Sequence, residues 1–157
     1  MISSDPSSTI PVARPHITEA DAQLVADAVR SGWVSHGPMV RKFEQDFAAV
    51  VGANHAIALN TGTAALHVSL AALDIGPGDE VIVPSLTFIS TANVVLYLGA
   101  KPVLVECDPE TFNVTPEIIA AAITTKTKAV IPVEMNGIPL DYAPLLQLCA
   151  EQNIALI

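Results

Sequence analysis

The segment of this sequence best suited to chemistry is the run Asn-Thr-Gly-Thr-Ala at residues 60–64. It follows the short apolar stretch 56–59 and opens an alanine- and leucine-rich stretch, so it should join a strand to a helix. The first amides of a helix have no partner within the helix and lie at the positive end of its dipole, which favours an anion such as phosphate. Gly62 would let the backbone approach that anion closely. A threonine-capped helix, with a glycine for tight packing, is the alternative explanation.

A second candidate is Phe88, which ends the run Pro-Ser-Leu-Thr-Phe after a later apolar stretch, in a chain with only 4% aromatic residues. Its ring could stack on a planar ligand, although an ordinary core phenylalanine is the alternative.

His55 and His67 have no acidic residue or second histidine at metal-ligand spacing, so we predict no metal site. The segment 60–66 matches neither the dinucleotide fingerprint nor the P-loop pattern.

Alternating strands and helices should position these residues. Short apolar strands that alternate with helices predict a parallel sheet covered on both faces, a three-layer α/β fold. Ligands of such sheets collect beyond the carboxyl ends of the strands, which makes residues 60–64, 84–88, 106–108 and 132–137 the informative ones. The pattern predicts strands at 56–59, 81–83, 102–105, 129–131 and 154–157, and helices from Thr18 to Ser31, around 43–50, at 61–73, 90–98, from Thr115 and at 141–151.

Composition excludes several classes of protein. The length fits one folded unit, with residues 1–10 as a disordered polar tail and residues 11–157 as the folded part. A net charge of -9 and the lack of a basic cluster argue against nucleic-acid binding. No apolar run approaches the roughly 18 to 20 residues that span a bilayer. Cys107 and Cys149 lie beside apolar segments without a CxxC grouping, so we expect both to be reduced and buried, in a cytoplasmic protein.

Several motifs together resemble a known family. Their order and spacing are similar to those of the DegT/StrS family of pyridoxal-phosphate (PLP) sugar aminotransferases, which have the aspartate-aminotransferase fold, fold type I. The chain would be the amino-terminal part of that fold's large domain, and the perosamine synthases are the nearest relatives that the motifs suggest. The motifs are Ser-Gly-Trp-Val-Ser-His-Gly-Pro at 31–38, residues 60–66, Gly-Pro-Gly-Asp-Glu-Val-Ile-Val-Pro at 76–84, residues 87–93, Gly-Ala-Lys-Pro-Val at 99–103 and Asp-Pro-Glu-Thr-Phe-Asn at 108–113.

The resemblance implies a role for each candidate. Gly62, Thr63 and Ala64 would hold the PLP phosphate, and Phe88 would stack on the pyridine ring. The loop 33–37 looks like the family's amino-terminal lid, with Trp33 and Ser35 as substrate-binding residues. The implied substrate is a nucleotide-activated keto sugar, with glutamate as the amino donor and a homodimer as the complete enzyme.

Two departures from the family pattern limit that reading. Glu134 stands where the family usually has a histidine, which leaves the contacts at this point open. The acidic partner of the pyridine nitrogen and the Schiff-base lysine of the family would fall after Ile157, and the four lysines of the chain lie in loop or surface contexts. We therefore assign no catalytic residue and expect these 157 residues to be inactive by themselves.

Three other functions remain open at this point. A PLP-dependent sugar dehydratase of the same family would have histidine at the Schiff-base position. A non-catalytic binding module would require that the 157 residues be the whole product. A dinucleotide-binding oxidoreductase is disfavoured because the first strand-to-helix turn lacks its glycine pattern.

Overall fold

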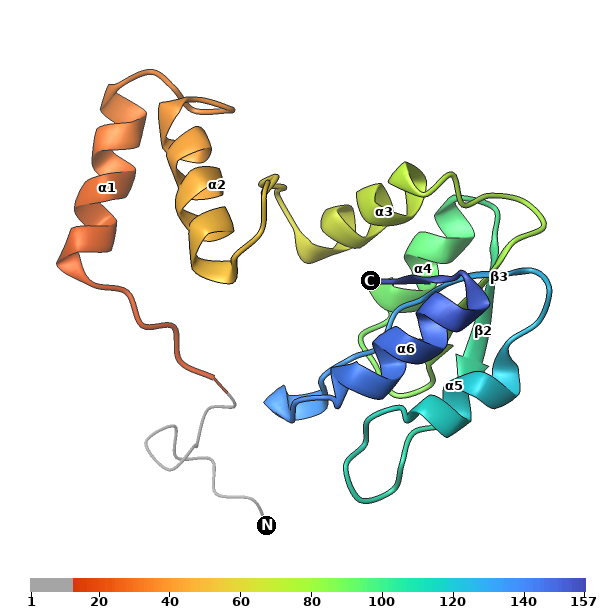
Figure 1. Ribbon diagram of the computed structural model, residues 1–157. Coiled ribbons are helices and arrows are strands. Elements are labelled where there is room, and N and C mark those ends of the chain that lie inside the picture. The colour runs from red at the N-terminus through yellow and green to blue at the C-terminus, as the bar shows by residue number, and fades with distance from the viewer. Residues whose placement is uncertain (1–12) are drawn as a thin grey trace, which may run out of the picture. The chain divides into compact units, whose positions relative to one another are not determined.

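The computed structural model describes residues 13–157, in two compact units that divide after Ala58. The predicted disordered tail at residues 1–10 lies outside the described residues. Figure 1 shows the elements of both units.

The first unit contains the helices α1 (Glu19–Arg30) and α2 (Pro38–Val51). Thr18 begins α1 with a capping box, in which its hydroxyl accepts from the Asp21 amide and the Asp21 carboxylate accepts from the Thr18 amide. Gly52 ends α2 in the left-handed conformation, with φ 70°, which glycine adopts without steric cost. Both helices confirm the sequence prediction.

The second unit is built on a four-stranded parallel sheet of β1 (Glu80–Pro84), β2 (Lys101–Val105), β3 (Thr127–Val130) and β4 (Ala155–Leu156). The strand order is β2-β1-β3-β4, so β1 lies between β2 and β3. The carboxyl ends of all four strands therefore meet at one edge of the sheet, which is called the carboxyl edge below.

Helices cover both faces of this sheet, which confirms the predicted three-layer α/β architecture. α3 (Gly62–Ala72) and α4 (Ser90–Tyr97) pack on one face, and α5 (Pro116–Ala122) and α6 (Tyr142–Gln152) pack on the other (Figure 1). Alternate residues of β1 serve the two cores, because successive side chains of a strand point to opposite faces. Val81 and Val83 join the core under α3 and α4, while Ile82 joins the core under α5 and α6.

Two sequence predictions were wrong. Residues 56–59 form no strand, although their composition is apolar, and Ile57 is largely exposed. A strand needs a neighbouring strand for its backbone hydrogen bonds, and no described residues pair with this segment. Both cysteines are free, as expected, but only Cys149 is buried and Cys107 is half-buried.

Candidate functional site

The first turn of α3 contains the residues for which the sequence predicts an anion site. Thr61 is the N-cap, and its hydroxyl accepts a hydrogen bond of 3.0 Å from the Ala64 amide. Its carbonyl accepts from the Ala65 amide at 3.1 Å. The amides of Gly62 and Thr63 have no acceptor in the described part of the chain. Two donors at the positive end of a helix of 11 residues are thus left for an external acceptor.

The surroundings of Gly62 decide between the two explanations of this glycine. A Cβ built on Gly62 would meet nothing within 4 Å, and its φ lies outside the left-handed region. Neither tight packing nor an unusual backbone conformation within the described chain requires glycine here. The open space over the helix start is what an approaching anion needs.

Phe88 is not a core residue. Its side chain is 75% exposed, four residues after β1 and two residues before α4. The neighbouring segment is held firmly, because the hydroxyls of Thr87 and Thr91 share a hydrogen bond of 2.9 Å and Ser90 and Thr91 are buried. An exposed aromatic ring on an ordered segment can serve as a stacking surface.

Chain direction brings both segments toward the carboxyl edge. α3 leads through a turn into the amino end of β1, and α4 leads in the same way into β2. Both helices therefore run against the strand direction and begin on the side of the carboxyl edge. They pack into one core through Leu70 of α3 and Val94 and Val95 of α4. Gly62 and Phe88 thus lie at the starts of two helices that share one face of the sheet.

The loop after β3 adds a carboxylate at the same edge. The Glu134 side chain accepts from the Leu140 amide at 3.4 Å, across a single 3-10 turn, η2 (Met135–Gly137). Burial raises the pKa of Tyr142, and the neighbouring Glu134 carboxylate raises that pKa further. Glu134 is itself exposed, so its carboxylate remains accessible to a ligand.

Asn113 is a residue of this region for which the sequence pattern predicts no role. It is 5% exposed, and its side-chain amide joins the loop after β2 to the loop after β3. Its only signal in the sequence was its position as the last residue of the family motif at 108–113. Sequence alone did not reveal its partners, which are 22 and 25 residues away along the chain.

Trp33 and Ser35 belong to the first unit, where they line apolar hollows beside α1. Trp33 is 60% exposed and borders two of them, of about 370 and 320 Å³, and Ser35 lines the smaller one. A Cβ added to Gly37 would lie 3.0 Å from the Trp33 Cβ, so this glycine gives the indole its room. Their role in substrate binding stays a prediction.

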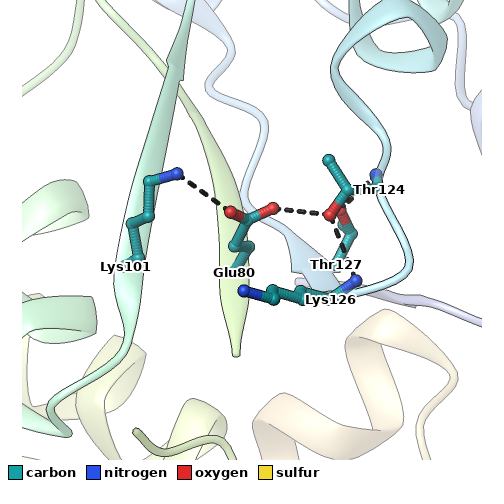
Figure 2. Close-up of polar contacts among 5 residues, drawn as sticks. All are labelled: Glu80, Lys101, Thr124, Lys126 and Thr127. Carbon is teal, nitrogen blue, oxygen red and sulfur yellow. Dashed lines mark hydrogen bonds and ion pairs between the residues drawn. The ribbon is translucent and has the colours of Figure 1, made fainter. Parts of the chain in front are cut away.

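The lysines of the second unit lie at the opposite, amino edge of the sheet. Lys101 donates to the Glu80 carboxylate at 2.9 Å, and the Thr124 hydroxyl donates to the other oxygen of that carboxylate at 2.6 Å (Figure 2). The Thr124 bond first, and then the Lys101 bond, lower the pKa of Glu80. Lys126 and Lys128 flank the start of β3 at the same edge. None of the three lies at the carboxyl edge with Phe88.

No group of three or more histidine, cysteine, aspartate or glutamate side chains could hold a metal ion within residues 13–157. No helix among the described residues is long and apolar enough to cross a membrane.

The fold places the chain in a structural class. A parallel sheet with helices on both faces, matched over most of the chain by solved aminotransferases, defines part of the large domain of PLP-dependent transferases of fold type I. A family model matches residues 15–157, and the chain belongs to the DegT/DnrJ/EryC1/StrS aminotransferase family. The cofactor of this family is PLP.

Three solved structures illustrate the similarity. The chain is 40% identical to an aminotransferase from Psychrobacter cryohalolentis, with a TM-score of 0.88 over 93% of this chain and 38% of that one. It is 40% identical to 3-amino-5-hydroxybenzoic acid synthase, with a TM-score of 0.86 over 92% of this chain and 38% of that one. A Streptococcus pneumoniae protein described as a sugar aminotransferase, in its PLP form, is 39% identical, with a TM-score of 0.86 over 93% and 38% of the two chains. The present chain thus spans well under half the length of these relatives.

Proposed function

We propose that this chain forms the part of a sugar aminotransferase that binds the phosphate and one face of the ring of PLP. The complete enzyme would transfer an amino group from glutamate to a nucleotide-activated keto sugar, as a cytoplasmic homodimer. The family and the solved relatives support the reaction class. The sugar, the nucleotide, the donor and the dimer are our inference from the family resemblance.

The observation that carries this proposal is the pair of unpartnered amides at Gly62 and Thr63. A phosphate dianion accepts several hydrogen bonds, and bonds from donors at a helix start are charge-assisted. The open space over Gly62 gives such an anion access to both amides. Ala64 lies in the same turn, but its own amide already donates to the Thr61 hydroxyl. The amides free for a phosphate are therefore those of Gly62 and Thr63.

The residues present also suit the ring of the cofactor. Phe88 offers an exposed aromatic face at the start of α4, the helix that packs beside α3. When bound, PLP supplies an electron sink for the carbon whose amino group is exchanged. The residues described here would bind and orient the cofactor, without taking part in proton transfer.

We further propose that the lysine which binds the cofactor covalently is none of Lys101, Lys126 and Lys128. All three lie at the amino edge, and Lys101 is already paired with Glu80. The 157-residue chain would then bind PLP reversibly, through its phosphate and ring alone, and would not transfer amino groups.

The test measures binding and turnover separately. Titration of the 157-residue chain with pyridoxamine phosphate should give saturable binding, and pyridoxamine, which lacks the phosphate, should bind far more weakly. An enzyme that carries this segment should convert a nucleotide-linked keto sugar and glutamate to the amino sugar and 2-oxoglutarate. Equal binding of the two ligands would refute the phosphate site, and loss of the sugar hydroxyl without amino transfer would favour a dehydratase.

A further inference from the structure

Asn113 connects two loops of the carboxyl edge that leave the sheet on either side of β1. Its amide nitrogen donates to the Ile138 carbonyl at 2.9 Å, and its amide oxygen accepts from the Met135 amide at 2.9 Å. Asn113 follows β2, whereas both partners follow β3. Since β1 lies between these two strands, the side chain of Asn113 holds together loops that do not leave neighbouring strands.

The backbone on the Asn113 side is fixed by a tight turn. The Asp108 carboxylate accepts from the amides of Thr111 at 2.8 Å and Glu110 at 3.0 Å, and these bonds lower the pKa of Asp108. Phe112 has φ 61°, a left-handed conformation that is uncommon for an aromatic residue and is kept only where its surroundings impose it. The turn therefore fixes the backbone from which the buried Asn113 side chain reaches the loop after β3.

The loop on the other side is closed on itself. The Gly137 amide donates to the Glu134 carbonyl at 3.2 Å, and the Glu134 carboxylate accepts from the Leu140 amide. Asn136 and Gly137 both have positive φ, at 55° and 76°. Asn113 forms a hydrogen bond with each end of this turn, at Met135 and at Ile138.

We propose that Asn113 is a positioning residue for substrate binding, because it fixes residues 134–138 and with them the Glu134 carboxylate at the carboxyl edge. β3 is the direct neighbour of β1. Their backbone hydrogen bonding continues past the end of β3, where the Ile131 amide donates to the Ile82 carbonyl at 2.9 Å. Glu134 thus follows the strand beside the one that leads to Phe88. An exposed carboxylate there would accept hydrogen bonds from sugar hydroxyl groups. This role rests on the proposed function.

The first experiment compares Asn113→Ala with Thr115→Ala by amide hydrogen exchange in the 157-residue chain. Thr115 caps α5 two residues further on, where its hydroxyl accepts from the Ile118 amide at 3.4 Å, and its side chain forms no hydrogen bond with residues 134–138 in the described part of the chain. Asn113→Ala should lower the protection of the amides of residues 135–138 and 140 by on the order of tenfold, because it removes two partly buried hydrogen bonds. Thr115→Ala should affect the amides of α5 and leave the loop unchanged. Equal loop protection in both variants would overturn the proposal.

A conservative variant gives a readout that general destabilisation would not imitate. Asn113→Asp keeps the acceptor for the Met135 amide but turns a carboxylate oxygen toward the Ile138 carbonyl, and two acceptors repel each other. Protonation restores a donor, so loop protection relative to the unaltered chain should recover as pH falls through the pKa of the new carboxyl group. A defect that stays constant with pH would contradict the assigned contact.

The kinetic experiment uses an enzyme that carries this segment, loaded with PLP. Asn113→Ala should raise KM for the keto sugar by on the order of tenfold and change kcat and PLP retention less than about twofold, whereas Thr115→Ala should change none of the three. A faster-exchanging loop with an unchanged KM would overturn the positioning role and leave the proposed function standing. Absence of PLP-dependent transfer in the unaltered enzyme would overturn both.

Discussion

Replacing Gly62 by alanine should change the stability of the fold and the affinity for the cofactor in opposite directions. Apart from the adjacent residues and the backbone of its own helix, the new methyl group would meet no atom of the described chain within 4 Å, and Gly62 is the first residue of α3. Gly→Ala at a helical position without strain stabilises a protein by about 0.4–1 kcal/mol, because the unfolded chain loses conformational freedom. The unliganded chain should therefore become more stable by about that amount.

The same methyl group would occupy the space through which an anion reaches the first amides of α3. Loss of one hydrogen bond to a charged group costs about 1.5–3 kcal/mol. This corresponds to a rise in Kd of about 10- to 100-fold. Titration with pyridoxamine phosphate, which cannot bond covalently to a lysine, measures this loss at the phosphate alone.

A matched control is Gly76→Ala, in the turn that leads into β1. A Cβ at Gly76 would lie 3.9 Å from the Leu98 carbonyl oxygen, an ordinary contact, and the turn is at the amino edge. This variant should leave pyridoxamine phosphate binding unchanged. Binding of pyridoxamine phosphate by Gly62→Ala as tight as that of the unaltered chain, or destabilisation of this variant in denaturant titration, would refute the assigned phosphate site.

Three further predictions test the ring contact, the core and the ion pair. Phe88→Ala should weaken pyridoxamine phosphate binding by only about 2- to 10-fold, because a stacking contact contributes about 0.5–1.5 kcal/mol. Ile119→Ala should lower the free energy of unfolding by about 2–5 kcal/mol in denaturant titration, because Ile119 is fully buried. The control, Ile89→Ala, replaces a side chain that is 64% exposed and should change this free energy by less than about 1 kcal/mol. Because the folded state lowers the pKa of Glu80 from its ordinary 4.5, the stabilisation by its carboxylate is fully present above that value and is lost as pH falls below it. The difference in denaturation midpoint between Glu80→Gln and the unaltered chain should therefore be larger at pH 7 than at pH 3.5, and an equal difference at both values would contradict this role.

The parts of the fold predicted from sequence are those that depend on near neighbours in the chain. The capping residues Thr18 and Thr115 each bond to an amide three residues ahead, so helix starts can be read from a short window. β1 was predicted as a short continuous apolar run, which is typical of a strand covered on both faces. Local patterns of this kind gave the α/β class and most element boundaries to within a few residues.

The predictions that failed or were missing depend on distant partners. Residues 56–59 have a strand-like composition, yet composition does not supply the neighbouring strand that their backbone groups would need. The partners of Asn113 and the Glu80–Thr124 bond join residues 22 to 44 positions apart, which no periodicity records. Local pattern suggested the anion site at residues 60–64 and a stacking role for Phe88, the family motifs gave them their PLP roles, and the structure adds the free amides at Gly62 and Thr63.

The two edges of the sheet differ in how their polar groups are used, and this difference supports the proposed phosphate site at the start of α3. At the amino edge the nearly buried Glu80 carboxylate is fully engaged, with Lys101 on one oxygen and Thr124 on the other (Figure 2). No described side chain carries a buried polar atom without a partner. The start of α3, toward the carboxyl edge, differs from this. Although Thr61 caps the helix, the amides of Gly62 and Thr63 have no acceptor in the described part of the chain. A polar group that its own chain satisfies stabilises the fold, whereas donors left free beside open space are available to a ligand, and it is the latter that a phosphate would use.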